Sequence, residues 1–368
     1  MSSAQGGAAS GARTVPSLTV TELRSGLNIP WDIAFVDSTH YLLTERSGKI
    51  SYGDRTTGSL TQVSANQSDV PAAGEGGLLG LAVDPAFASN RRFYTCQTNG
   101  PANDNRVVRW TLAAGGVSAV RAGAPVVKGI PRGTIHNGCR VLFGPGGKLF
   151  VSTGDAATGR APQSLTNLGG KILRVNKDGT IPRDNPWPNA ADPKRRYVWN
   201  YGHRNPQGLA WRPGTTQLWN SEHGPDRDDE VNLVLKARNY GWNPVRNASD
   251  PSYYQQVPMT DLAEFPNAVA AKWSSGVPTL ATSGMTFISG ASWGDYNGVA
   301  FVAQLKGSGV LALWLDAAGT VLSTAEVPEL NDTYGRLRTV RMGPDGALYV
   351  LTSNGASADK ILRVTPNP

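Results

Sequence analysis

The chain has 368 residues, with 43 glycines, 25 prolines, 17% charged side chains and a formal net charge of +7, a composition typical of many short strands joined by turns. Its basic residues are scattered, with no run longer than the three at 194–196 and no nucleic-acid motif, which argues against a nucleic-acid partner. No apolar stretch reaches the length of a membrane span.

Residues 1–13 are small and polar and are expected to form a flexible N-terminal tail, followed by a single domain over 14–368. The domain consists of repeats of one unit. Each unit has an apolar strand, a turn containing Pro, Gly, Asp or Asn, a second strand and a polar loop. The six copies lie at 31–48, 78–100, 140–159, 208–225, 284–307 and 339–355.

Further strand-like runs between the copies, at 171–179 and 309–319, complete four strands for each unit. Six such units around an axis predict an all-β fold, a six-bladed β-propeller of four-stranded antiparallel blades. A two-sheet sandwich is the competing all-β fold, but it does not predict six equivalent copies. In a propeller, the loops after the second strands converge on one face, so we expect Asp155, the turn at 222–225 and Lys306 to approach one another.

His136 is the candidate base among four histidines, because its short polar loop leads directly into an inner strand. Asp155 ends the second strand of the same unit and is expected to accept the imidazole N–H, leaving the other ring nitrogen as the base. His40, His203 and His223 are interpreted as structural. The two cysteines, Cys96 and Cys139, form either one disulfide or two buried thiols.

Several cations precede or follow strands that face the same channel. Arg204 and Asn205 precede the inner strand of the fourth unit, Arg336 and Arg338 precede that of the sixth, and Lys306 follows the second strand of the fifth. Such cations would repel one another unless an anion lay between them, so they indicate a multiply charged anionic ligand. For Arg204 and Asn205, the alternative is a simple turn with pairing to nearby acids.

The acidic stretch at 221–232 indicates a hard cation. The turn Gly224–Pro225 offers carbonyl oxygens to calcium, and Asp229 and Glu230, with Tyr240 nearby in sequence, are candidates for a second calcium site. The alternative is a solvated acidic loop.

Taken together, these residues resemble the soluble quinone-dependent glucose and aldose-sugar dehydrogenases, whose cofactor is pyrroloquinoline quinone (PQQ). The resemblance spans about 26–364. It rests on the segments GLLGLAVDP (77–85), GGKILRVNKDGTIPRDNP (169–186), GHRNPQG (202–208), SEHGPDRDDEVN (221–232), NYGW (239–242) and YGRLRTVRMGPDG (334–346).

The resemblance implies a six-bladed propeller and a role for each candidate residue. It makes His136 the catalytic base and Asp155 its orienting carboxylate, and it places Gly224 and Pro225 on the calcium that bridges to the quinone. It also implies a second calcium at Glu230 and Tyr240. The groups implied to hold PQQ are Arg204, Asn205, Lys306, Arg336 and Arg338.

The chain departs from the family pattern at three places. Glu75 stands where the pattern commonly has Gln, which puts a carboxylate among the groups beside an acidic cofactor. Ile135 precedes His136 where the glucose enzyme has Asp. Trp273 and Trp293 are the candidates for a sugar-stacking surface.

The resemblance implies oxidation of aldose sugars at C1 to lactones, with electrons passed to an external acceptor, in an extracytoplasmic (secreted or periplasmic) protein. Two other functions remain open. The propeller could be a catalytically silent binding module. It could also be a calcium-dependent lactonase, although that enzyme should bind calcium through side-chain carboxylates and Asn on several blades.

Overall fold

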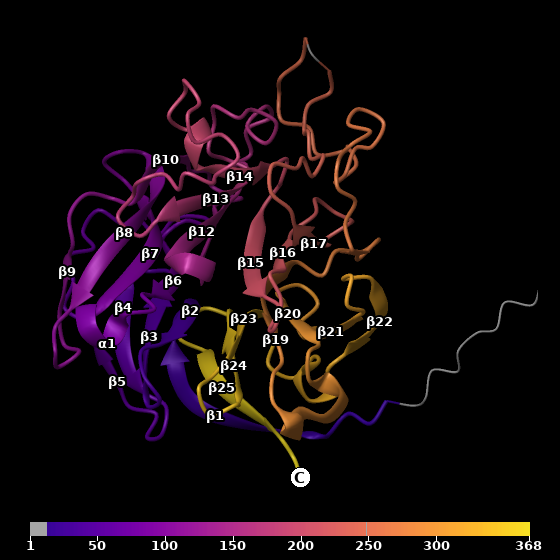
Figure 1. Cartoon of the computed structure of the whole chain (residues 1–368). Helices are drawn as coiled ribbons and strands as arrows, with labels where there is room; N and C mark the ends of the chain where they lie inside the picture. Colours follow the sequence, from indigo (N-terminus) through magenta and orange to yellow (C-terminus); the bar gives the residue numbers. More distant parts are fainter. Residues whose placement is uncertain (1–12, 248) are drawn as a thin grey trace, which may run out of the picture.

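The structure is a computed structural model that describes residues 13–247 and 249–368. The expected N-terminal tail therefore lies outside the described residues, except for Arg13. The architecture is the expected six-bladed β-propeller, with six antiparallel sheets arranged around a central axis (Figure 1). None of the helices in the described part of the chain is long and apolar enough to span a membrane.

The first three blades follow one another in chain order. Blade one contains β2 (Pro30–Phe35), β3 (His40–Glu45), β4 (Lys49–Asp54) and β5 (Leu60–Gln62); blade two contains β6 (Leu78–Val83), β7 (Arg92–Asn99), β8 (Asp104–Leu112) and β10 (Val127–Pro131), with β9 (Ala119–Arg121) also paired to β8; blade three contains β11 (Gly138–Gly144), β12 (Lys148–Thr153), β13 (Lys171–Asn176) and β14 (Val198–Tyr201).

The last three blades repeat this order. Blade four contains β15 (Pro206–Trp211), β16 (Leu218–Glu222), β17 (Glu230–Val234) and β18 (Trp273–Ser274); blade five contains β19 (Thr282–Phe287), β20 (Ala300–Gln304), β21 (Val310–Leu315) and β22 (Val321–Glu326); blade six contains β23 (Leu337–Met342), β24 (Leu348–Thr352), β25 (Asp359–Pro366) and β1 (Leu18–Leu27). The helices are short: α1 (Phe87–Asn90), η1 (Pro145–Gly147), η2 (Arg195–Tyr197), η3 (Ala291–Tyr296) and η4 (Pro328–Leu330).

Blade six closes the ring by joining the two ends of the chain. β1 pairs antiparallel with β25, from Leu18 opposite Pro366 to Leu27 opposite Asp359 (Figure 1). The first described strand is thus the outer edge of the last blade, and every blade is completed by hydrogen bonds.

Apolar side chains fill the space between neighbouring blades. The alternation along each strand sends one set of side chains toward the next sheet, as where Trp219 of blade four meets Phe287 of blade five edge to face. The inner strands also approach one another closely. A Cβ at Gly80 would lie 2.1 Å from the carbonyl oxygen of Cys139 on the neighbouring inner strand, so only glycine fits there.

Each of the six inner strands carries a register shift at its first residues. A bulge at this place ends the regular pairing and changes the direction of the side chains beside it. All six bulges lie at the same end of the channel, where the second strands end. This end of the propeller therefore gathers side chains from every blade.

Candidate active site

A cavity of about 260 Å³ lies at the bulged ends of the inner strands. It has residues from all six blades or the loops that lead into them. The lining residues are Trp31, Arg46, Glu75, Leu79, Asn137, Gly138, Gln207, His223, Ala281, Leu305, Arg336 and Arg338. Three arginines face one glutamate here, so the cavity carries a positive charge that suits an anionic ligand.

His136 and Asp155 are in contact at the edge of this cavity. The Nδ1 atom of His136 lies 2.8 Å from Oδ1 of Asp155, and both side chains are buried. A carboxylate at Nδ1 selects the tautomer with the proton on Nδ1 and leaves Nε2 free to accept a proton. The backbone of His136 has a φ of 58°, and its N–H donates to Oε2 of Glu75 at 2.7 Å.

The loop that follows Asp155 is held by a buried lysine. The Nζ of Lys171 donates to the carbonyl oxygens of Ala161, Pro162 and Gly169 at 2.7, 2.9 and 2.6 Å. Burial lowers the pKa of Lys171 well below its usual range. One side chain thus takes up three carbonyl groups of the loop and fixes the segment between Asp155 and β13.

Arg338 carries the buried part of the positive charge. Its guanidinium donates to Ser353 and Gln207 at 3.0 and 3.1 Å, and it lies over the Trp31 ring. Burial, together with the neighbouring Arg336, lowers the pKa of Arg338 to about 9. The positive charge of Arg338 is destabilised by burial and by Arg336, so a bound anion would stabilise it.

Arg204 and Asn205 directly precede β15 of blade four, next to the blade that carries His136, and leave polar atoms without partners. Arg204 donates to the carbonyl oxygen of His223 at 3.0 Å and to Oε1 of Gln255 at 2.5 Å, whereas Asn205 accepts the N–H of Gly138 at 3.0 Å. Nε of Arg204, Nδ2 of Asn205 and Nε2 of His223 are buried and have no partner within the described residues. Free donors beside a cationic cavity fit the acidic, oxygen-rich ligand that the sequence predicts.

Lys306 and His223 do not lie where the sequence led us to expect them. Lys306 is not part of the cavity wall; its Nζ lies 3.3 Å from Oγ1 of Thr279, while the preceding Leu305 lines the cavity. His223, interpreted from the sequence as structural, lines the cavity instead. Burial and the nearby Arg204 lower the pKa of His223 well below its usual range, so its imidazole is neutral.

The turn Gly224–Pro225 lies beside the cavity and is fixed by Asp229. Oδ1 of Asp229 accepts the N–H of Gly224 at 2.8 Å, and Oδ2 accepts the N–H groups of Leu280 and Ala281 at 2.5 and 2.6 Å. Among the described residues, no hydrogen bond ends on the carbonyl oxygens of Gly224 or Pro225. These two oxygens suit a hard cation, and Asp229 holds them in place; calcium at Gly224, Pro225 or Asp229 stays a prediction.

The proposed second calcium residues belong to a buried polar cluster. Oε2 of Glu230 lies 3.2 Å from Asn232, and burial with the nearby Glu222 raises the pKa of Glu230 to about 8. The Tyr240 hydroxyl donates to Leu233 at 2.5 Å, so its side chain is already engaged by the backbone.

Glu222 of this cluster already contacts Nδ1 of His203 at 2.7 Å, and no group of three or more His, Cys, Asp or Glu side chains suited to a metal occurs in residues 13–247 and 249–368. A second calcium at Glu230 and Tyr240 remains untested.

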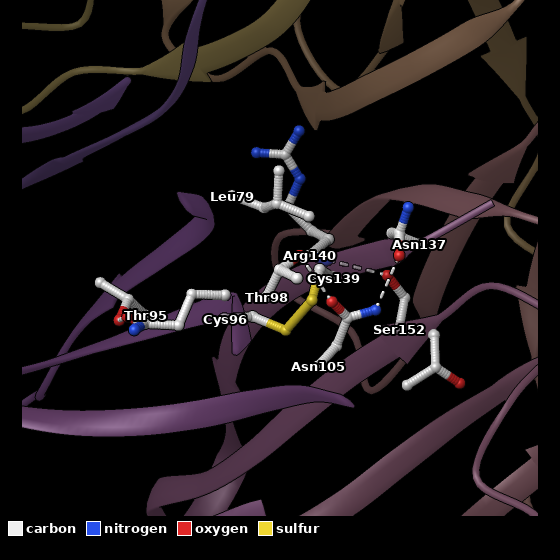
Figure 2. The surroundings of a disulfide bond; sticks show 12 residues. Leu79, Thr95, Cys96, Thr98, Asn105, Asn137, Cys139, Arg140 and Ser152 are labelled. Atoms are coloured by element: carbon white, nitrogen blue, oxygen red, sulfur yellow. Dashed lines mark hydrogen bonds between the residues drawn. A yellow bond between two sulfur atoms is a disulfide. The ribbon is translucent and has the colours of Figure 1, made fainter. Parts of the chain in front are cut away.

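Cys96 and Cys139 form a disulfide between blades two and three, which decides between the two expected states (Figure 2). Cys139 follows His136 by three residues and begins the bulged part of β11. Beside it, Asn137 accepts a hydrogen bond from Asn105 at 2.9 Å. The covalent link and this amide pair tie the loop of His136 to the neighbouring blade.

Several residues of the site could not be assigned to it from the sequence. Trp31 and Arg46 line the cavity, yet nothing in their local sequence distinguishes them from other residues at strand ends, whereas the cavity residue Gln207 lies in the GHRNPQG segment. Tyr253 lies in a stretch without periodicity and contacts Asp155. Trp242, whose Nε1 donates to Oδ2 of Asp155 at 2.8 Å, had a similar signal, because it ends the NYGW segment.

The two tryptophans expected to stack on a sugar are placed elsewhere. Trp293 is fully buried in the core between blades five and six, and Trp273 packs against apolar side chains of blades four and five.

Comparison with known proteins finds relatives among the glucose and aldose-sugar dehydrogenases that the sequence resembles. Aldose sugar dehydrogenase YliI of Escherichia coli is 31% identical over 359 residues, covering 95% of this chain and 93% of that protein. Quinoprotein glucose dehydrogenase B of Acinetobacter calcoaceticus is 31% identical over 318 residues, covering 77% of this chain and 63% of that protein.

Among solved structures, the PQQ-bound aldose sugar dehydrogenase of Streptomyces coelicolor superimposes with a TM-score of 0.77 at 31% identity, covering 97% of this chain and all of that one. The sequence profile of the glucose/sorbosone dehydrogenases matches residues 27–363, nearly the whole propeller. The chain therefore belongs to the glucose/sorbosone dehydrogenase family.

Proposed function

We propose that this protein is a quinoprotein dehydrogenase that uses PQQ and calcium to oxidise aldose sugars at C1 to lactones and passes the electrons to an external acceptor. The observation that carries the proposal is the buried His136–Asp155 pair at the edge of a cationic cavity. A pure binding module needs no oriented base beside its ligand site. The family and its PQQ-bound relative support the same function.

The cavity residues would hold the cofactor by charge and hydrogen bonding. Arg336 and Arg338 would pair with its carboxylates, and the free donors of Arg204 and Asn205 would reach its oxygens. The carbonyl oxygens of Gly224 and Pro225 would hold calcium. When bound, PQQ would supply the hydride acceptor and calcium would supply a Lewis acid.

His136 would perform the proton transfer. Its Nε2 would take the proton of the C1 hydroxyl during hydride transfer from C1, and Asp155 would stabilise the resulting imidazolium through Nδ1. The guanidinium of Arg204 would supply positive charge beside the bound cofactor.

A reconstitution experiment tests this function. The apoprotein is mixed with PQQ and calcium, and reduction of an artificial dye is followed with several aldoses. We expect stoichiometric PQQ binding and aldose-dependent reduction in the parent protein. Dye reduction no faster than that by free PQQ would contradict the enzyme function and favour a binding module, whereas lactone hydrolysis with calcium alone would favour a lactonase.

We also propose an extracytoplasmic location. The Cys96–Cys139 disulfide supports it, because disulfides persist mainly in oxidising compartments. Fractionation of the native cells tests it, and recovery of the protein in the cytosolic fraction would contradict it.

A further inference from the structure

The long connection between β17 and β18, over 235–272, leaves blade four and reaches the catalytic pair on blade three. It carries Tyr253, whose hydroxyl donates to Oδ2 of Asp155 at 2.9 Å and lies 3.2 Å from Nδ1 of His136. It also carries Trp242, whose Nε1 donates to the same Oδ2 at 2.8 Å. A single connection thus supplies two donors to one carboxylate oxygen.

We propose that Tyr253 is a positioning residue for the sugar oxidation, acting through Asp155 to fix the orientation and the basicity of His136. This inference rests on the proposed function of the His136–Asp155 pair. It goes beyond that function because it assigns the orientation and basicity of His136 to the connection between β17 and β18, which lies outside the repeats.

The hydrogen bonds at Asp155 carry the inference. Oδ1 accepts from His136 and from the N–H of Ala157, both at 2.8 Å, and Oδ2 accepts from Trp242 and Tyr253. With both oxygens engaged, the carboxylate cannot rotate and its Oδ1 stays in line with Nδ1. Donors on Oδ2 also spread the negative charge, so they weaken the pull of Asp155 on the imidazole proton.

Tyr253 is suited to remain a donor. Burial, followed by the charge of Asp155, raises the pKa of Tyr253, so its hydroxyl keeps the proton that it donates. The groups that face His136 are Asp155, Tyr253, Glu75 and the neutral His223, and Arg204 lies beside the Tyr253 hydroxyl. Of these, only Tyr253 contacts both His136 and the far oxygen of Asp155.

The neighbouring residue Tyr254 provides a matched control. It lies on the same connection, but its ring packs under the guanidinium of Arg246, 4.6 Å from the ring centre. Tyr253→Phe removes one hydroxyl from the catalytic pair, and Tyr254→Phe removes one from the same loop without touching that pair.

The first measurement needs no turnover. The proton on Nδ1 of His136 is observed by NMR in the full-length apoprotein labelled with ¹⁵N-histidine, and its signal is assigned with His136→Gln. In Tyr253→Phe we expect this signal to move downfield, because Asp155 with one donor fewer is a stronger acceptor. Tyr254→Phe should leave it in place. A Tyr253→Phe signal identical to the parent's would overturn the inference, whatever the activity of the parent.

The second measurement is a double-mutant cycle in the enzyme loaded with PQQ and calcium. Tyr253→Phe should lower kcat by about tenfold, the effect of one hydrogen bond to a charged group, with little change in KM. In an Asp155→Asn background, the same change should have a much smaller effect, because Tyr253 acts through Asp155. Equal losses in both backgrounds would overturn the inference. Absence of aldose oxidation in the parent would instead contradict the proposed function alone.

Discussion

At the scale of single residues, the site combines a buried acid–base pair with an excess of positive charge. The catalytic carboxylate accepts hydrogen bonds from four donors, whereas buried nitrogen atoms of Arg204, Asn205 and His223 have no hydrogen-bond partner within the described residues. The first set is complete without a ligand and fixes geometry. The unpartnered nitrogen atoms can form hydrogen bonds with a bound ligand.

His136→Gln separates these two roles. Glutamine keeps a side chain of similar reach but cannot act as a base, so we expect kcat to fall by about two to four orders of magnitude. The affinity for PQQ should stay nearly unchanged, because His136 is not among the cationic groups of the cavity. Single-turnover kinetics and PQQ titration check the two parts. Normal turnover would show that another residue is the base, and Asp155 would be tested next.

Glu75→Gln should tighten PQQ binding. The carboxylate of Glu75 lines the cavity, where it adds negative charge beside an acidic cofactor, while a glutamine oxygen can still accept the N–H of His136. We expect the Kd to fall by about threefold to tenfold from the lost repulsion. Fluorescence titration measures it, with Glu22→Gln on the outer strand of blade six as control. Unchanged affinity would mean that Glu75 does not approach the bound cofactor.

At the scale of elements, the bulges of the six inner strands explain how distant residues meet. A regular strand alternates its side chains between two faces, whereas a bulge redirects the residues beside it. Trp31, Leu79, Gly138, Gln207 and Arg338 all lie at these bulges and all line the cavity.

The turn between β16 and β17 allows a test of the calcium site. Asp229→Asn removes the charge that holds Gly224, Leu280 and Ala281 through three N–H groups, so the carbonyl oxygens should lose their fixed spacing. We expect calcium affinity in the presence of PQQ to fall at least about tenfold.

The matched control is the exposed Asp226 of the same turn, since Asp226→Asn should have no such effect. Isothermal titration with calcium checks both variants. Equal calcium affinities in the two variants would place the ion away from this turn.

The sequence predicts the repeated parts of the molecule and much less of the rest. The six-bladed fold follows from the repeat, and the contact of His136 with Asp155 follows from their places in one unit. The positions of Arg46 and Tyr253 could not be predicted in this way. Arg46 resembles any arginine at the end of a strand, and Tyr253 lies in a connection whose path depends on tertiary contacts.

At the scale of the whole molecule, the disulfide links two blades across a chain separation of 43 residues. Closing a loop of this length restricts the unfolded chain, so replacing both cysteines by alanine should lower the free energy of unfolding by about 4 kcal/mol. Denaturant unfolding followed by tryptophan fluorescence measures the change. An equal stability of the parent in reducing and non-reducing buffer would argue that the bond contributes nothing.

The pairing of β1 with β25 has a practical consequence for attaching the protein to a surface. Leu27 and Asp359 pair at the cavity end of blade six, so Leu18 and Pro366 pair at the opposite end. A tether attached near Leu18 or Pro366 would hold the propeller with its cavity facing away from the surface. Dissolved dyes would reach such an immobilised layer freely, whereas direct electron exchange with an electrode beneath it would have to cross the full height of the blades.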